Sequence, residues 1–108
     1  MSEGRTGKRR KFDPAHYPAL REFLPAYLHQ DFREEYDAAA EAVRGFVKEA
    51  TGDEIVLVKE EWKMFRADFR GRSLREIQGA LGALGSAWLP ASEDELRQVD
   101  EILLDAQA

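Results

Sequence analysis

Apolar residues recur at alternating steps of three and four along one stretch of the chain: Ile55, Val58, Trp62, Phe65 and Phe69. This spacing places them on one stripe of an α-helix. A strand over residues 55–58 is the alternative, but a strand does not explain why the apolar series continues in phase through Phe69. Thr51 and Glu54 stand at the two positions of a capping box. The sequence therefore predicts a helix that begins after Thr51 and continues to about Phe69.

Four further segments carry helical patterns. The first extends from Pro18 to about His29, where Pro25 predicts a kink, or two short helices in place of one. A second extends from about Glu35 to Ala50, with Tyr36 on its apolar stripe. Two more begin at capping-box patterns, Ser73 with Glu76 and Ser92 with Glu95, and the former segment ends at Gly85. Residues 86–90 form the loop between these two.

These patterns predict an all-α fold, a compact bundle of about five amphipathic helices in roughly two layers. Residues 14–108 are expected to form a single domain, since 108 residues with 44% hydrophobic composition suit one core. Residues 1–13 are expected to be a basic disordered tail, because the first eleven contain a Lys and Arg cluster and no large apolar residue after Met1. The chain has no cysteine, which excludes disulfides and thiolate chemistry.

Charge is distributed unevenly along the chain. The formal net charge is −5, but residues 1–13 hold five Lys and Arg against two Asp and Glu, so the rest holds 11 against 19, or −8. Such an acidic body repels nucleic acid and anionic lipid and attracts cationic partners. The longest aliphatic run, residues 55–58, is far shorter than the roughly 20 residues that cross a bilayer as a helix. No apolar segment follows the basic stretch as in a secretory signal, so a cytoplasmic location is expected.

Catalytic, cofactor-binding and metal-binding residues are not predicted. The two histidines, His16 and His29, lack the spacing of zinc ligands, and Gly79, Gly82 and Gly85 lie in a helical pattern with no strand before them. Ser86 does not stand in the Gly-x-Ser-x-Gly motif of a nucleophilic serine.

The pair His29 and Asp31 is the one constellation with catalytic potential, because a carboxylate can orient an imidazole. Two residues apart, they do not share a helix face. The favoured interpretation is structural: Asp31 caps the following amides, His29 meets the last carbonyls of the first helix, and Phe32 anchors the turn in the core. Contact with a partner is the second interpretation, and catalysis the third.

Three segments near the N-terminus form a recognisable signature: YPAL at residues 17–20, FL at 23–24 and AYLHQDF at 26–32. This signature resembles that of a small helical family of contact-dependent growth inhibition immunity proteins. EAVR at residues 41–44 with Phe46, and Leu84-Gly85 before Trp88 and Pro90, are similar to later parts of that family, so the resemblance covers about residues 14–106. Pro25, the basic tail and the short loop of residues 86–92 depart from it.

The resemblance implies a cytoplasmic antidote that binds the toxic C-terminal domain of an effector delivered by a neighbouring cell, without catalysis. It implies a protein partner and no cofactor, no membrane contact, and only a disfavoured role for nucleic acid. The alternative is a nucleic-acid-associated accessory protein that uses the basic tail.

Two acidic regions are candidate contacts with the partner, and ordinary solvating charge is the competing interpretation for both. The first lies around the signature: Asp31, Glu34, Glu35 and Asp37. The second lies on the last helix: Glu93, Asp94, Glu95, Asp100, Glu101 and Asp105. The signature residues themselves are expected to be mainly structural: Tyr17, Pro18, Tyr27, His29, Gln30, Asp31 and Phe32.

Overall fold

The computed structural model describes residues 12–106, so the predicted tail lies almost entirely outside the described residues. Within that range every regular element is helical, which confirms the all-α fold class. The elements are a short 3-10 helix η1 (Pro14–His16) and the helices α1 (Pro18–Tyr27), α2 (Phe32–Glu35), α3 (Ala39–Glu49), α4 (Gly52–Asp68), α5 (Leu74–Ala83) and α6 (Glu93–Asp105).

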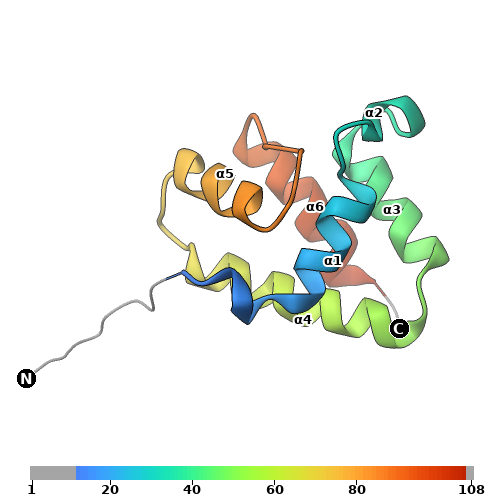
Figure 1. Ribbon diagram of the computed structural model, residues 1–108, viewed down its shortest axis with the longest axis horizontal. Helices are drawn as coiled ribbons and strands as arrows, with labels where there is room; N and C mark the ends of the chain where they lie inside the picture. Colours follow the sequence, from blue (N-terminus) through green and yellow to red (C-terminus); the bar gives the residue numbers. More distant parts are fainter. Residues whose placement is uncertain (1–11, 107–108) are drawn as a thin grey trace, which may run out of the picture.

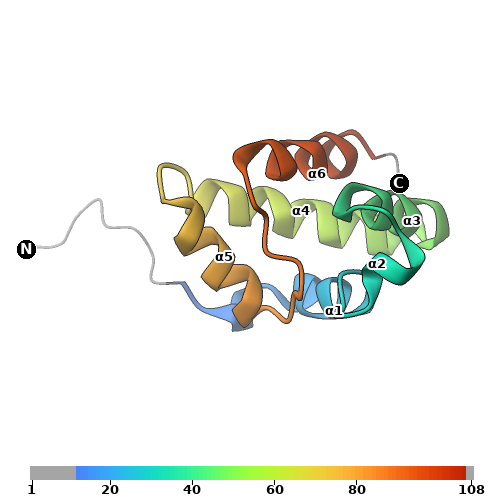
Figure 2. The same cartoon turned by 90° about the horizontal axis from the view of Figure 1, so that it is seen from above.

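Helix α4 is the longest element and runs along the lower part of the molecule in Figure 1. Helices α1 and α6 both contact it, and Figure 2 shows them on opposite sides of α4. Helix α3 packs mainly on α6 and also contacts α1. The apolar stripe of α4 is buried as expected, with Trp62 and Phe65 fully inaccessible to solvent. Burying such large side chains supplies the main driving force for folding.

The end of α1 differs in part from the prediction. The helix ends at Tyr27, two residues earlier than expected, but it passes through Pro25 as one continuous helix, so the alternative of two short helices is wrong. Pro25 has a packing role. Gly85, at φ +97°, ends the α5 segment, and a Cβ added there would lie 3.3 Å from the Pro25 ring. Glycine therefore meets both the backbone conformation and the close approach of the proline.

The predicted helix from Glu35 to Ala50 is split in the structure. A single turn, α2, is followed by extended backbone at Tyr36 and Ala38, and α3 begins only at Ala39. Tyr36 is partly buried against the core, and its ring packs beside Gly45 of α3. A Cβ at Gly45 would lie 2.7 Å from the Tyr36 hydroxyl oxygen. The extended backbone between α2 and α3 places this ring against the glycine.

Two of the three predicted capping boxes are complete, those of Thr51 with Glu54 and of Ser73 with Glu76. Arg72 also donates hydrogen bonds to the Glu76 carboxylate, which with the Ser73 amide lowers the pKa of Glu76 from its usual 4.5 to about 2. The third box is incomplete.

At the start of α6, Ser92 accepts a hydrogen bond from the amide of Glu95 as predicted. The Glu95 carboxylate instead accepts hydrogen bonds from the indole N–H of Trp88 at 3.0 Å and the amide of Ala91 at 3.3 Å. The buried Trp88 needs an acceptor, and Glu95 provides it.

The start of α1 is capped by another helix. Tyr17, at the N-cap position, supplies no side-chain capping bond within the described structure. The amide of Leu20 donates to the carboxylate of Glu61 on α4 at 3.0 Å. The buried Tyr17 hydroxyl donates to the carboxylate of Asp68, also on α4. These two bonds hold α1 against α4, because each joins the start of α1 to a side chain of α4.

Candidate partner-binding surfaces

The turn between α1 and α2 holds the central residues of the signature. His29 Nδ1 accepts a hydrogen bond from the amide of Asp31 at 3.1 Å, so the imidazole meets a following amide and not the last carbonyls of α1. Asp31 occupies the N-cap position of α2, but its side chain makes no capping bond within the described residues. These two expectations are therefore wrong. Phe32 is 4% exposed and anchors the turn, as expected.

The charged neighbour of the His29 imidazole is Glu35. Nε2 of His29 lies 3.8 Å from a Glu35 oxygen, an ion pair when the imidazole is protonated. Both side chains are largely open to solvent, so this contact stabilises the turn only weakly. The geometry is that of a surface turn closed by a histidine.

The other signature residues divide into buried and accessible ones. Tyr17 is buried and Pro18 is the first residue of α1. Gln30 is exposed. Tyr27 is half-buried, and its hydroxyl donates to Glu49 on α3 at 2.9 Å. The signature thus contributes both to the core and to the surface beside α3.

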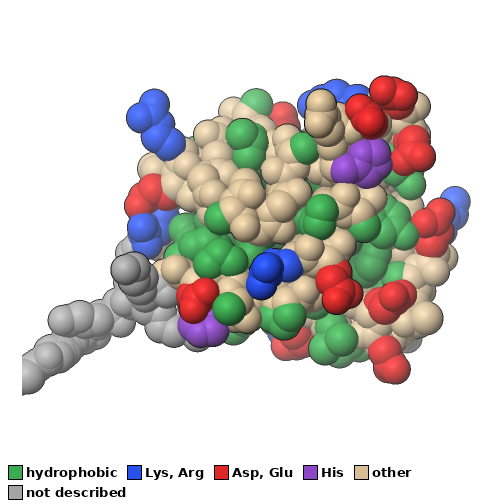
Figure 3. Space-filling model, viewed as in Figure 1, with side chains coloured by type: hydrophobic (Ala, Val, Ile, Leu, Met, Phe, Trp, Pro, Cys, Tyr) green, Lys and Arg blue, Asp and Glu red, His purple; other side chains and the backbone are tan. Residues whose placement is uncertain are grey.

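The acidic residues around the signature share one exposed region: Asp31, Glu34, Glu35 and Asp37. We call these four residues the acidic cap. Figure 3 shows acidic side chains gathered over the α2 and α3 end of the molecule, with apolar side chains between them. A region of this kind attracts cationic macromolecules electrostatically, and added salt reduces the range of that attraction by screening.

The acidic residues of α6 have separate roles. Asp100 accepts hydrogen bonds from the indole of Trp62 at 2.7 Å and from Arg66 at 3.0 to 3.3 Å, so it belongs to the interior packing. Glu95 binds Trp88, as described above. Asp94 forms an ion pair with Arg97 at 2.8 Å. The remaining acidic candidates on this helix are exposed: Glu93, Glu101 and Asp105.

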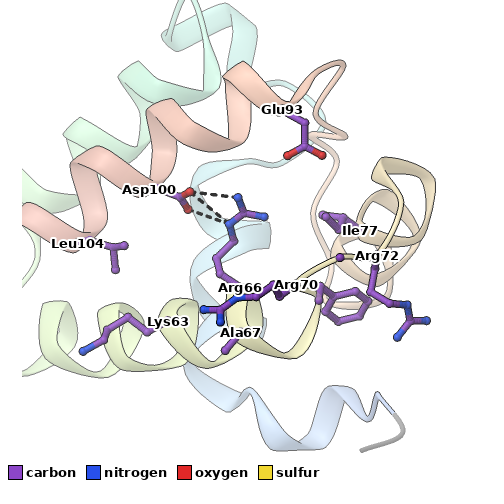
Figure 4. A pocket seen from close by; sticks show the side chains of 11 residues that line it. Lys63, Arg66, Ala67, Arg70, Arg72, Ile77, Glu93, Asp100 and Leu104 are labelled. Carbon is purple, nitrogen blue, oxygen red and sulfur yellow. Dashed lines mark hydrogen bonds and ion pairs between the residues drawn. The ribbon is translucent and has the colours of Figure 1, made fainter. Parts of the chain in front are cut away.

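A hollow of about 730 Å³ lies between α4, α5 and α6 (Figure 4). Its walls carry Lys63, Arg66, Arg70 and Arg72, and Glu93 and Asp100 face them from the α6 side. Arg66 is paired with Asp100, and Arg72 with Glu76. Lys63 and Arg66 lie on α4, whereas Arg70 and Arg72 lie in the turn after it. Its cations are largely compensated from within the protein.

A smaller groove of about 260 Å³ lies between α1, α3 and α4. Its lining is apolar and acidic: Ala19, Glu22, Phe23, Ala26, Tyr27, Phe46, Glu54, Leu57 and Val58. We call it the α1–α4 groove. Leu57, which lies off the buried stripe of α4, is 57% exposed. Burial, the hydrogen bond to Glu49, and the negative charges of Glu49 and Glu54 raise the pKa of Tyr27 to about 12.

Metal sites and membrane-spanning helices are both absent from the described part of the chain. Residues 12–106 contain no group of three or more His, Cys, Asp or Glu side chains placed to hold a metal ion. None of the helices in that range is long and apolar enough to span a membrane.

Comparison with known proteins places the chain in a family. The model of the CdiI immunity protein family matches residues 16–95, which are 80 of the 108 residues. No curated protein and no solved structure matches the chain. The matched range extends from the 3-10 helix before α1 to the first turn of α6, and so contains the signature, the acidic cap and the α1–α4 groove. The chain belongs to the CdiI immunity protein family.

Proposed function

We propose that this protein binds the toxic C-terminal domain of a contact-dependent growth inhibition effector and neutralises it in the cytoplasm of the cell that produces both. Membership of the CdiI immunity protein family gives the chain a toxin-neutralising immunity function in general terms, with a toxin protein as partner. That family match, over about three quarters of the chain, is the observation that carries the proposal.

The charge of the surface supports a cationic protein partner. The four residues of the acidic cap are exposed, and the chain beyond residue 13 has an excess of eight acidic residues. An enzyme that acts on a polyanion presents a positive surface, and electrostatic attraction to such a surface accelerates association. Inhibition by occupying or distorting that surface needs no chemistry from the immunity protein.

Non-catalytic action is consistent with the geometry of the signature turn. His29 contacts an amide and the Glu35 carboxylate, both on the protein surface. An imidazole in this position holds the turn and faces open solvent. The proposal therefore assigns the signature to folding and to partner contact.

Coexpression tests the proposal. The toxin domain encoded next to this chain is expressed in a bacterial host with and without the chain, and growth and copurification are measured. We expect the chain to restore growth and to copurify with that toxin domain, but not with a toxin domain of an unrelated effector. Continued killing by the neighbouring toxin, in cells that contain folded protein, would refute the proposal. Nucleic-acid binding that requires residues 1–11 would favour the accessory-protein alternative.

A further inference from the structure

The α1–α4 groove has an aromatic floor that is already packed in the free protein. The rings of Phe23 and Phe46 lie 4.6 Å apart, and Tyr27 lies 5.4 Å from Phe46 and 5.8 Å from Phe23. The hydrogen bond to Glu49 fixes the Tyr27 hydroxyl. A floor with fixed rings loses little side-chain entropy when another surface packs on it. Phe23 and Phe46 are 4% and 5% exposed and belong to the core, so Tyr27 is the ring of the three that a partner can reach.

The charge around this floor has one sign. Glu22 on α1 and Glu54 on α4 line the groove, and Glu49 lies beside it through Tyr27. The described residues that line it include neither Lys nor Arg. Burial is the largest cause of the raised pKa of Tyr27, and the neighbouring carboxylates of Glu49 and Glu54 raise it further. The groove therefore favours a positive group.

The size and exposure of the groove favour side chains of a partner protein. A volume of about 260 Å³ is below the roughly 300–1,000 Å³ of small-molecule sites. Leu57 is the most exposed large apolar side chain in the described chain, at 57%, and it stands at the edge of the groove. Covering it would bury apolar surface that the monomer leaves in water.

The larger hollow between α4, α5 and α6 also holds carboxylates and an exposed leucine, Leu104 at 37%, but its walls carry cations as well. Arg66 and Arg72 are already bound by Asp100 and Glu76, and Lys63 lies 3.9 Å from Glu60. A charged partner would have to break these pairs before it gained its own. The α1–α4 groove offers carboxylates and an uncovered leucine with neither Lys nor Arg among the described residues that line it.

We propose that the α1–α4 groove is the toxin-docking site, and that it receives a segment of the toxin domain with a Lys or Arg next to a large apolar residue. The apolar residue packs on Tyr27 and Leu57, and the cation lies between Glu22 and Glu54. This inference rests on the proposed function, which supplies the partner. It adds the place of contact and the chemistry of the segment that is recognised.

Matched pairs of variants test this assignment. Leu57→Lys places a cation in the groove, whereas Val56→Lys changes the adjacent residue of α4, which is 44% exposed and outside the groove lining. Glu22→Lys reverses a groove charge, whereas Glu101→Lys makes the same change on exposed α6. Binding of each purified, folded variant to the neighbouring toxin domain is measured by calorimetry, and folding is checked by melting curves.

We expect Leu57→Lys and Glu22→Lys each to raise the dissociation constant at least about tenfold. The dissociation constants of the two controls should stay within about threefold of the wild-type value. If wild type binds and the groove variants bind equally well, the docking assignment is wrong while the proposed function stands. A fifth variant, Glu34→Lys, changes a charge of the acidic cap. Loss of binding only in Glu34→Lys or only in Glu101→Lys would overturn the docking assignment in favour of the acidic cap or α6. If the wild-type protein does not bind, the proposed function and this inference both fail.

Discussion

Substitution of Asp100 should show most clearly that an acidic residue of α6 can serve the interior packing instead of the surface. Its carboxylate joins α6 to α4 by accepting the indole N–H of Trp62 and a forked pair of bonds from Arg66. Trp62 is fully buried, so water cannot replace the lost acceptor without a change in packing. In Asp100→Ala both donors lose their partner.

The expected cost follows from these two contacts. A buried donor without an acceptor costs about 1–3 kcal/mol. The ion pair adds less than about 1 kcal/mol, because the Arg66 and Asp100 side chains are 26% and 20% exposed and solvent screens their interaction. We therefore expect Asp100→Ala to lower the free energy of unfolding by about 1–4 kcal/mol. For a domain of this size the melting temperature should fall by about 4–18 °C.

The assay compares urea and thermal unfolding of wild type, Asp100→Ala, Asp100→Asn and Asp105→Ala. Asp100→Asn keeps an acceptor for the indole and should lose only about 1 kcal/mol. Asp105→Ala removes an exposed acid of the same helix and should change stability by less than about 0.5 kcal/mol. An Asp100→Ala protein that melts within a few degrees of wild type would refute the reasoning, and so would equal losses in the Ala and Asn variants.

Three further predictions concern helix ends. Glu61→Ala should cost about 1 kcal/mol in urea unfolding, because it removes the cap of the Leu20 amide, and Glu61→Gln should restore part of the loss. His29→Ala should lower stability by about 0.5–1 kcal/mol, whereas Asp31→Ala should be close to neutral, and the reverse order in melting curves would contradict the observed turn. The folded-state pKa of Glu76 is lowered from 4.5 to about 2, so its contribution is present above pH 4.5 and is lost as pH falls toward 2. Unfolding measured across that range should depend less on pH in Glu76→Gln than in wild type.

Local sequence patterns predicted the elements whose causes are local. The apolar stripe from Ile55 to Phe69 gave α4 to within about a residue, and Thr51 and Ser73 marked two helix starts correctly. Each of these signals is contained within one turn or one face of the helix that it predicts. The fold class followed from them.

The errors have non-local causes. Tyr36 fits a helical stripe in the sequence, but its ring packs over Gly45 and breaks the helix before α3. Glu95 fits a capping box, but it binds the indole of Trp88. Asp100 has the sequence context of a surface acid, and only the fold brings Trp62 to it. In each case a tertiary partner competes successfully with the local pattern.

The two acidic regions were visible in the sequence, whereas the α1–α4 groove was not. The groove is lined by side chains of three helices whose residues lie between positions 19 and 58, so no short motif contains it. One signal was available: Leu57 lies beside the stripe of Ile55 and Val58 instead of on it. A large apolar residue on the polar side of a helix is a reason to expect a covered surface.

The attachment of α1 at both of its ends limits the ways in which the protein can bind a partner. Glu61 holds its first turn, while its far end is joined to the loop after α5 by the contact of Pro25 with Gly85 and by the bond from the Ala87 amide to the Leu28 carbonyl at 2.8 Å. A helix held in this way does not swing outward to admit a ligand. Recognition along α1 should therefore be rigid-body docking, with single-exponential association kinetics whose rate rises linearly with toxin concentration.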